Sequence, residues 1–579
     1  MKRLAMVLVA ISAVVVQLGA NPGGNGSSRF SAIEATIPDI QKALQTRLIT
    51  TEQLVEIYLN RIQTYDPASR RATDEDGRVF FGLNSYLHIN PPAADEARAS
   101  DATRHRGNIK SPMFGVPIIL KDNIDTFDLP TTAGSVALHN SIPLGDAFIV
   151  RKLRDAGAII LGKATLTEFA NFLTNGMPAG YSSLGQYGYN PYDPRPDPRP
   201  LPIGDGRPVL TPGGSSSGPG IAVGANLAAI GVGTETSGSI LSPGTANMLV
   251  GIKPTVGLIS RDGIVPITAD QDTAGPLART VTDAAILLGV LAGFDPADIA
   301  TGACLTPGNC FDDYTRFLDK RALRGARIAV PPPPANRQAI IDNAVAVLRA
   351  EGAFVELIPA LPALPGGCPS GVNGVNYPPA AGCTTVLNYG FKRDLNAYFS
   401  AHVSPFAPVK SLLDVINYNS AHAADVPSSV KYGQDLALFS QKFNTSPGSS
   451  DTIRYQADRA SDLALSQAAL DGVLNGPDGV RGTDDDFDAI LFSGNSGAAT
   501  PAKAGYPSIV VPGGFFSNVN AAFPADFKPL PGPAGVTFSG RAFSEPRLIG
   551  LAYAFEQATH YRVPPPSAPA LPGDTVGRP

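Results

Sequence analysis

Two clusters of serine set within glycine are the residues of this chain best suited to chemistry. Both lie in the stretch 211–246, which reads TPGGSSSGPGIAVGANLAAIGVGTETSGSILSPGTA. Because glycine adopts positive φ angles and has no Cβ, backbone N–H groups in such loops can point at an anion or a developing oxyanion. A flexible linker would be polar throughout, whereas these clusters flank the apolar run 221–232, which predicts a buried helix and strand.

A lysine at the end of an apolar run is the second chemical candidate. Lys121 follows residues 117–120 in GVPIILKDNID. Burial at a strand end would lower its pKa and give a neutral amine that acts as a base. The alternative is a lysine whose ammonium simply reaches solvent, and this segment alone does not decide between them.

Two other motifs compete for the first serine cluster. A phosphate-binding P-loop needs lysine where Pro219 stands, so that motif is excluded. The stretch GSSSG formally satisfies the nucleophile elbow of an α/β-hydrolase, with Ser216 as nucleophile, but RPVLTP upstream is a poor strand. The elbow also needs a downstream histidine, and those available are His402, His422 and His560.

In combination, three motifs resemble the amidase signature family. They are GVPIILKDNID with Lys121, GGSSSG with Ser215 and GTETSGSI with Ser239, and the two serines are 24 residues apart, as the family requires. The likeness continues through 248–283 and reaches 544–558. It implies the α/β amidase signature fold, a single large domain whose central mixed β-sheet is covered by helices on both faces.

The resemblance also implies a Ser-cisSer-Lys triad. Ser239 would attack an amide carbonyl, and Ser215, held by a cis peptide bond, would relay the proton to Lys121 as base. The scheme is coherent because a serine hydroxyl needs an adjacent base, and a neutral lysine can replace histidine. No cofactor or metal is implied, and water clears the acyl-enzyme. Backbone N–H groups would form the oxyanion hole, at Thr236, Ser237, Gly238 and Ser239.

The pattern departs from the family at two places. Leu241 stands where arginine is frequent, and Ser237 stands where the family often has glycine. Since oxyanion donors are backbone groups, we expect the chemistry to survive both changes. The ETSGSILSP form resembles the peptide-amidase-like exported branch, whose members cut C-terminal carboxamides or simple amides. The alternatives are an esterase using Ser216 and a catalytically silent secreted binding protein.

The surrounding elements must position these groups. Thr50 and Gln53 are spaced as a capping box before an amphipathic stretch, which predicts a helix to residue 65. Further helical patterns alternate with short apolar runs, and this alternation predicts one layered α/β domain. The helical patterns span 148–155, 166–173, 281–292, 337–351 and 546–558, and the apolar runs span 159–161, 328–330, 354–357 and 508–512.

We expect the amidase domain to span 31–563 and a Pro-rich tail to occupy 564–579. Turn-rich stretches near 189–210, 361–383 and 475–488 are predicted to be insertions. The last of these gathers carboxylates but lacks the spacing of an EF-hand, so we expect a solvated acidic turn and no calcium site.

The N-terminus has the order of a secretory signal: a basic start, thirteen apolar residues at 4–16, then QLGA. This predicts a signal peptide at 1–20, a tail at 21–30 and a secreted or periplasmic protein. Thirteen apolar residues fall short of the roughly 20 that cross a bilayer, so no stable membrane span is expected. Two disulfides are predicted, most simply Cys304–Cys310 and Cys368–Cys383.

Composition excludes other classes. Of the 579 residues, 43% are hydrophobic and only 16% charged, which excludes a disordered polyelectrolyte. A net charge of −5 without a basic tract argues against a nucleic-acid partner. The expected partners are a small-molecule or peptide amide and water, and both a monomer and a homodimer are compatible with the sequence.

Overall fold

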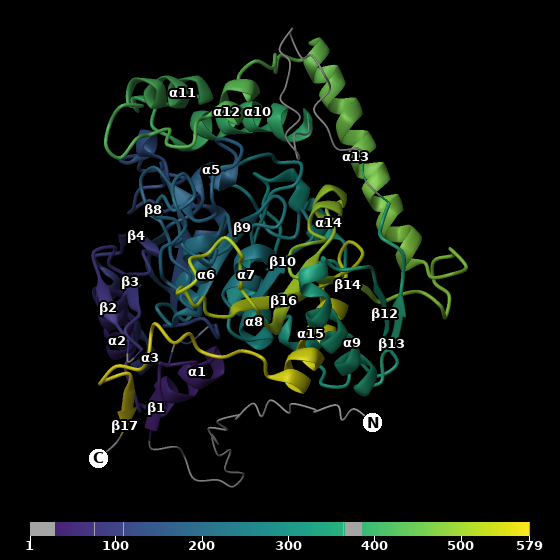
Figure 1. The fold of residues 1–579 in the computed structure, drawn as a ribbon, viewed down its shortest axis with the longest axis horizontal. Helices are drawn as coiled ribbons and strands as arrows, with labels where there is room; N and C mark the ends of the chain where they lie inside the picture. Colours follow the sequence, from purple (N-terminus) through teal and green to yellow (C-terminus); the bar gives the residue numbers. More distant parts are fainter. Residues whose placement is uncertain are drawn as a thin grey trace, which may run out of the picture.

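A mixed eleven-stranded sheet runs through the centre of the protein (Figure 1). The computed structural model describes residues 29–577, apart from 75, 108, 110, 363 and 365–384. From edge to edge the strands are β13 (Phe354–Leu357), β12 (Arg327–Val330), β14 (Ala489–Ser493), β16 (Gly532–Ser539), β15 (Ser508–Phe516), β10 (Val250–Lys253), β11 (Thr273–Ala278), β9 (Ile230–Glu235), β5 (Pro117–Lys121), β6 (Ile159–Ala164) and β4 (Tyr86–Ile89). Strands β13, β12 and β14 are parallel, as are β6, β5 and β9, and the other pairs are antiparallel.

Helices cover both faces of this sheet, which confirms the expected fold class. Helices α8, α9 and α15 pack on the strands, and α15 contacts both α8 and α9. Helices α6 and α7 form another contacting pair on the sheet. These helices are α6 (Ser217–Gly224), α7 (Leu241–Ala246), α8 (Val281–Leu291), α9 (Gln338–Ala350) and α15 (Glu545–Thr559). The remaining helices around the sheet are α1 (Ile37–Gln45), α2 (Thr51–Tyr65), α3 (Ala93–His105), α4 (Phe148–Asp155), α5 (Glu168–Asn171) and α14 (Ala499–Ala504).

Most local predictions agree with the structure. Helix α2 begins after Thr50, and both hydrogen bonds of the capping box with Gln53 are present. The apolar run 221–232 forms the end of α6 and the start of β9, as expected. The helix predicted over 166–173 is wrong, because Phe169 and Ala170 have φ of 46° and 55° and the chain turns there. The turn is tied down by the Phe169 N–H, which donates to the Ala133 carbonyl at 2.9 Å.

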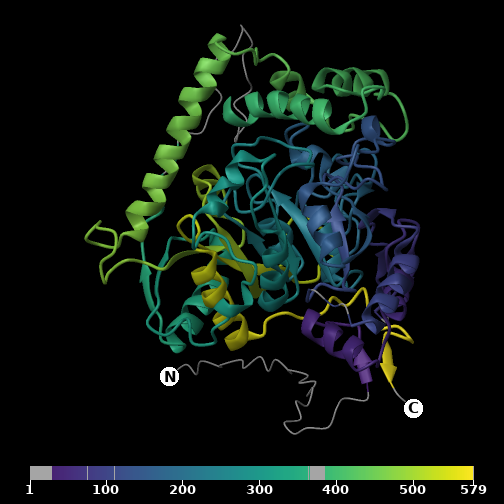
Figure 2. The ribbon, with the colours of Figure 1, turned by 180° about the vertical axis from the view of Figure 1, so that it is seen from behind.

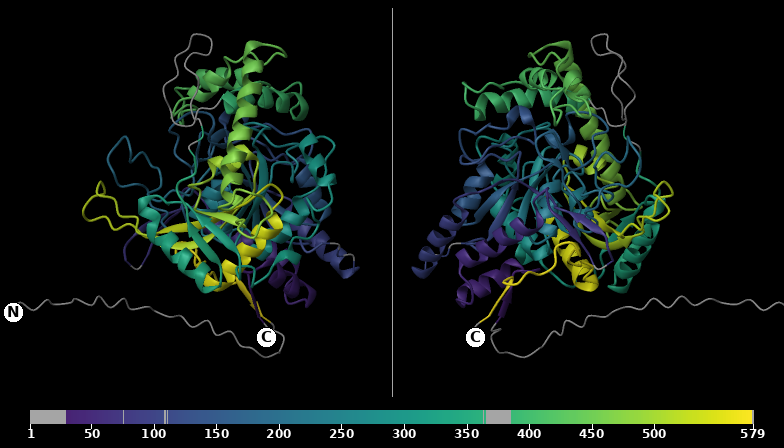
Figure 3. Two further views of the ribbon diagram at one scale, coloured as in Figure 1. Left: turned by 90° about the vertical axis from the view of Figure 1, so that its right-hand side faces the viewer. Right: turned by 60° about the vertical axis from the view of Figure 1, so that its left-hand side comes forward.

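A group of four helices lies beyond one end of the sheet and was not expected from the sequence (Figures 1 and 2). Its members are α10 (Thr385–His402), α11 (Leu412–Ala421), α12 (Asp435–Ser440) and α13 (Ser450–Leu474). Two side views show the same placement, with α13 reaching from this group down along the body (Figure 3). Helix α10 builds a second core, where Phe391 meets Phe169 and Phe172 edge-on. None of the described helices is long and apolar enough to span a membrane.

The C-terminal segment packs onto the domain instead of trailing beyond residue 563. Strand β17 (Thr575–Gly577) pairs antiparallel with β1 (Arg29–Ser31), which the sequence placed partly in an N-terminal tail. Beneath them Arg61, fully buried, donates to the Asp574 carboxylate at 2.6 Å. The arginine also donates to the carbonyls of Ala225 and Asn226, so it joins the C-terminal segment to the loop after α6.

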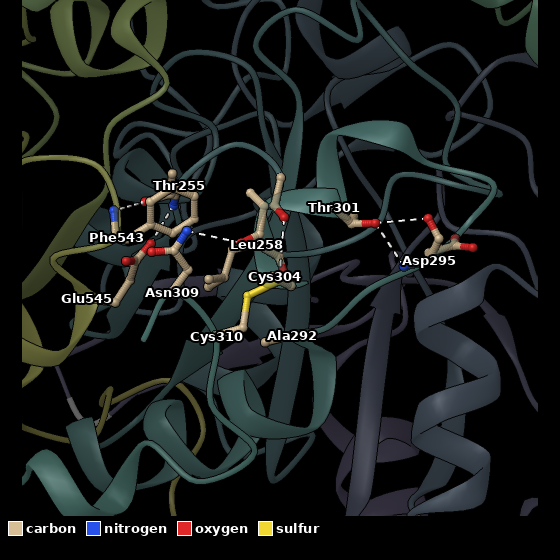
Figure 4. The surroundings of a disulfide bond; sticks show 12 residues. Thr255, Leu258, Ala292, Asp295, Thr301, Cys304, Asn309, Cys310, Phe543 and Glu545 are labelled. Carbon is tan, nitrogen blue, oxygen red and sulfur yellow. Dashed lines mark hydrogen bonds between the residues drawn. A yellow bond between two sulfur atoms is a disulfide. The ribbon is translucent and has the colours of Figure 1, made fainter. Parts of the chain in front are cut away.

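Cys304 and Cys310 form the predicted local disulfide (Figure 4). It lies against the segment after β10, where the Cys304 sulfur is 3.6 Å from the Leu258 carbonyl oxygen. Cys368 and Cys383, most of the insertion 361–383, the signal peptide 1–20 and the tail up to residue 28 lie outside the described residues. Short two-stranded ribbons complete the fold: β2 (Arg71–Thr73) with β3 (Val79–Phe81), and β7 (Tyr181–Ser182) with β8 (Gln186–Tyr187).

The other two turn-rich stretches have well-defined internal bonding. Within 189–210, three aspartates each pair with an arginine two residues later: Asp193 with Arg195, Asp197 with Arg199 and Asp205 with Arg207. Within 475–488, acidic side chains accept backbone N–H groups of their own turn, as Asp478 does from Val480 and Asp486 from Gly482. The described residues contain no group of His, Cys, Asp or Glu arranged to hold a metal ion.

Candidate active site

The turn from β9 into α7 carries Ser239. At its start, the buried Glu235 carboxylate accepts the N–H groups of Gly238 at 2.7 Å, Ile240 at 2.7 Å and Leu241 at 3.0 Å. These bonds lie on both sides of Ser239 in the chain. Glu235 therefore fixes the backbone from which the Ser239 side chain projects.

Lys121 ends β5, the strand next to β9. Its Nζ lies 2.8 Å from both Ser215 Oγ and Thr234 Oγ1, and 3.3 Å from the Thr234 carbonyl oxygen. The side chain has no exposed surface, so the solvent-reaching alternative is wrong. Burial lowers the pKa of Lys121 to about 7, although the carboxylates of Asp272 and Glu235 favour its charged form. At neutral pH the lysine is therefore available as a neutral amine.

The two serine clusters are linked through their backbones. The peptide bond between Gly214 and Ser215 is cis. The Ser216 N–H donates to the Ser239 carbonyl at 3.2 Å, and the Gly214 N–H donates to Ser242 Oγ at 3.3 Å. The hydroxyls of Ser215 and Ser239 are not hydrogen-bonded to each other among the described residues.

Exposure distinguishes the three candidate catalytic side chains. Ser239 keeps 7% of its surface exposed, whereas Lys121 and Ser215 have none. Solvent, and hence a substrate, can reach only the group expected to be the nucleophile.

Three of the four expected oxyanion donors are free. Within the described structure the N–H groups of Thr236, Ser237 and Ser239 have no acceptor. The Gly238 N–H differs from the expectation, because the Glu235 carboxylate already occupies it. Because this charge-assisted hydrogen bond is strong, the Gly238 N–H is not available, and the other three backbone N–H groups are the ones that can donate to an oxyanion.

Asp272 supports the same turn from β11's side, and sequence reasoning assigned it no role. Its half-buried carboxylate accepts the Thr236 hydroxyl and the N–H groups of Ile267 at 2.8 Å and Thr268 at 2.9 Å. Burial raises the pKa of Asp272 to about 7. Glu235 was missed in the same way; the only signal for either was an acidic residue inside a glycine- and threonine-rich motif, GTETSGS or QDTAGP.

Ser216 does not serve as the nucleophile of a hydrolase elbow. It is fully buried, and its hydroxyl donates to the Thr234 carbonyl at 3.0 Å and accepts the Thr234 N–H at 3.2 Å. None of its bonds involves a histidine. The esterase alternative is therefore wrong. Ser216 instead holds the backbone of Thr234, the strand residue that contacts Lys121.

Known proteins share both the sequence and this architecture. A family model described as Amidase matches residues 79–365. A probable amidase of Arabidopsis thaliana is 37% identical over 571 residues, which are 97% of each chain. The crystal structure of native peptide amidase from Stenotrophomonas maltophilia is 34% identical, has a TM-score of 0.73, and aligns over 92% of this chain and 98% of its own.

A second solved structure, an amidase family protein from Bacillus anthracis, is 33% identical with a TM-score of 0.75 over 92% of each chain. These likenesses extend along nearly the whole chain, including the segments that carry Lys121, Ser215 and Ser239. The chain thus belongs to the amidase signature family and is an enzyme that hydrolyses amides.

Proposed function

We propose that the protein is a serine amidohydrolase that works through an acyl-enzyme on Ser239. The observation that carries the proposal is the 2.8 Å contact between Lys121 Nζ and Ser215 Oγ, with the lysine fully buried and its pKa lowered to about 7. A neutral amine in this position can take a proton from Ser215 as Ser215 takes one from Ser239.

In the first half-reaction, Ser239 Oγ attacks the amide carbonyl carbon while its proton passes through Ser215 to Lys121. The oxyanion accepts hydrogen bonds from the backbone N–H groups of Thr236, Ser237 and Ser239. The C–N bond then breaks, and the proton returns through Ser215 to the leaving nitrogen. The relay requires the Ser239 hydroxyl to turn toward Ser215 when substrate binds, a tightening that is common between free and occupied sites.

In the second half-reaction, water attacks the acyl-enzyme and passes one proton along the same relay. Breaking the ester bond returns that proton to Ser239 and releases the carboxylic acid. The substrate class that we propose is peptide C-terminal carboxamides or small aliphatic and aryl amides. The likeness to the peptide amidase supports the first of these. The paired Lys121 and Ser215 argue against a catalytically silent binding protein.

We further propose that the protein is exported and acts as a secreted or periplasmic enzyme. The order of residues at 1–20 supports this. The Cys304–Cys310 disulfide supports it too, since disulfides persist in oxidising compartments. Fractionation of cells producing the full chain, with N-terminal sequencing of the product, tests the proposal, and intact protein retained in the cytoplasm would contradict it.

Release of ammonia from peptide carboxamides and aliphatic amides, and of aniline from anilides, tests the catalytic proposal. The chain is expressed from Asn21, with Ser239→Ala, Ser215→Ala, Lys121→Ala and Ser216→Ala measured beside it. We expect activity to be lost in the first three variants and kept in Ser216→Ala. An active enzyme that is indifferent to Ser239→Ala would refute the mechanism.

A further inference from the structure

A cavity of about 260 Å³ beside α7 is lined by polar and apolar residues, with one cation and no carboxylate among them. We propose that it binds a carboxylate of the substrate, so that the enzyme prefers peptide carboxamides whose C-terminal residue has an acidic side chain. The inference rests on the proposed function, because it assigns a substrate preference to the same active site.

Arg337 is the one charged residue among those that line the cavity. It forms no ion pair with any described residue; its guanidinium lies over the Phe516 ring, 3.4 Å from the centroid, and its Nη1 donates only to the adjacent Asn336 carbonyl. Partial burial lowers its pKa, but an arginine stays charged at any pH at which the protein is folded. A half-buried guanidinium without a counter-charge is a ready partner for a planar, bidentate carboxylate.

Neutral hydroxyl and amide side chains lie beside apolar ones in the rest of the lining. Thr245 Oγ1 is buried there and has no hydrogen-bond partner. Ser242 Oγ accepts the Gly214 N–H, which leaves its own proton free to donate. A Cβ on Gly494 would lie 3.0 Å from Thr245 Oγ1, so glycine keeps this corner open. An unsatisfied buried hydroxyl is costly, and an acceptor oxygen placed in the cavity would satisfy it.

The cavity adjoins the catalytic turn. Ser242, on its wall, is three residues after Ser239 and bonds to the residue before Ser215. Asn495, also on its wall, approaches the turn from the other side, because a Cβ on Gly238 would lie 3.5 Å from its Nδ2. A substrate whose carbonyl reaches Ser239 therefore has this cavity beside it, and the proposal places its C-terminal side chain there.

The charge balance selects the kind of anion. Because the lining holds one cation and its other residues are uncharged, it matches a single negative charge, and a carboxylate fits this better than a phosphate dianion. In a peptide carboxamide the whole peptide lies on the acyl side of the scissile bond. Glutamate or aspartate at the C-terminal position is therefore the group that would enter.

The test compares two substrates, N-acetyl-alanyl-glutamic acid α-amide and N-acetyl-alanyl-leucine amide, by kcat/KM for ammonia release. We expect the wild type to favour the glutamic acid amide. In Arg337→Met, which keeps the packing on Phe516, the ratio of the two kcat/KM values should fall by about tenfold, the usual worth of one charge-assisted hydrogen bond. Arg337→Lys should keep an intermediate ratio, since it retains the charge but loses the planar fork.

Arg316→Met is the matched control, because Arg316 also lies over aromatic rings, 4.2 Å from the Phe311 centroid, but lines no part of this cavity. Its ratio should equal that of the wild type. An unchanged ratio in Arg337→Met, or a wild type that favours the leucine amide, would overturn the anion site while leaving the amidase function intact.

Calorimetric binding of N-acetylglutamic acid α-amide to Ser239→Ala separates the two proposals further. Binding that is weakened about tenfold by adding Arg337→Met supports the cavity even if turnover fails for another reason. If the wild type hydrolyses neither amide, the proposed function is contradicted for this substrate class. If Ser239→Ala also binds the glutamic acid amide no better than the leucine amide, the anion site is overturned as well.

Discussion

The acid limb of the pH–rate profile should report the protonation of Lys121. Burial lowers its pKa from 10.5 to about 7, which corresponds to disfavouring the buried ammonium by about 5 kcal/mol. At pH 7 about half of the enzyme then has a neutral lysine, and at pH 5 only about 1% does. With an unshifted lysine, the neutral fraction at pH 7 would be only about 0.03%. We therefore expect kcat/KM to be constant above pH 8 and to fall about fiftyfold between pH 7 and pH 5.

The assay is ammonia release at low substrate concentration from pH 5 to pH 9, with a melting curve at each pH. Unfolding is not expected to produce the limb. The native carboxyls of Asp125, Glu168 and Asp272 have their pKa raised to about 7, so as the pH falls through 7 they take up protons before the unfolded chain does. This uptake stabilises the native state. Below pH 7 Lys121 is protonated in both the native and the unfolded state, so the amount by which its burial destabilises the native state no longer changes with pH.

Asp272 titrates in the same range, so Asp272→Asn identifies the group responsible. Its carboxylate favours the charged form of Lys121, and removing it should lower the lysine pKa and move the acid limb to lower pH. The asparagine can keep its oxygen toward the N–H groups of Ile267 and Thr268. A wild-type rate that is flat from pH 5 to pH 9 would refute lysine as the base. A limb that vanishes entirely in Asp272→Asn would assign it to the aspartate.

Three further substitutions probe the supporting contacts. Glu235→Gln replaces one of the two acceptor oxygens by an NH₂ group. We expect the free energy of unfolding in urea to fall by about 1–3 kcal/mol, and kcat to fall more than KM changes. An unchanged kcat would argue against a positioning role for Glu235. Ser216→Ala removes both hydrogen bonds to the Thr234 backbone, so the free energy of unfolding should fall by about 1–2 kcal/mol while amide hydrolysis persists. A variant that is folded but inactive would contradict this prediction. Asp574→Asn leaves the buried Arg61 charge without its counter-ion, and a destabilisation of about 3 kcal/mol is expected by chemical denaturation; a loss below 1 kcal/mol would show that the carbonyl acceptors suffice.

The chemical groups could be predicted from sequence because each lies in a short motif that needs no distant partner to be identified. Lys121, Ser215 and Ser239 come from three separate segments, and the structure brings Lys121 and Ser215 within hydrogen-bonding distance. The occupation of the Gly238 N–H was not predictable, since GTETSGSI does not show that the glutamate side chain folds back onto its own turn. The role of Asp272 depends on the pairing of β11 with β9, which is a tertiary fact.

Local periodicity predicted helices whose ends are set by their own residues, as Thr50 sets the start of α2. It failed where distant contacts decide the backbone. The turn at Phe169 is held by Ala133 and by the aromatic contact with Phe391, more than 200 residues later. Helix α13 was missed because few of its residues are buried, and its sequence shows no apolar stripe of the usual width.

The pairing of Arg61 with Asp574 joins residues 513 positions apart, and it has a consequence for how the molecule is assembled. Closing so long a loop has a large entropic cost that local helix formation does not bear. Until it closes, a guanidinium destined for the interior has no counter-charge, and the N-terminal helices cannot complete their packing. The early part of the chain is therefore stable only once the late part has docked.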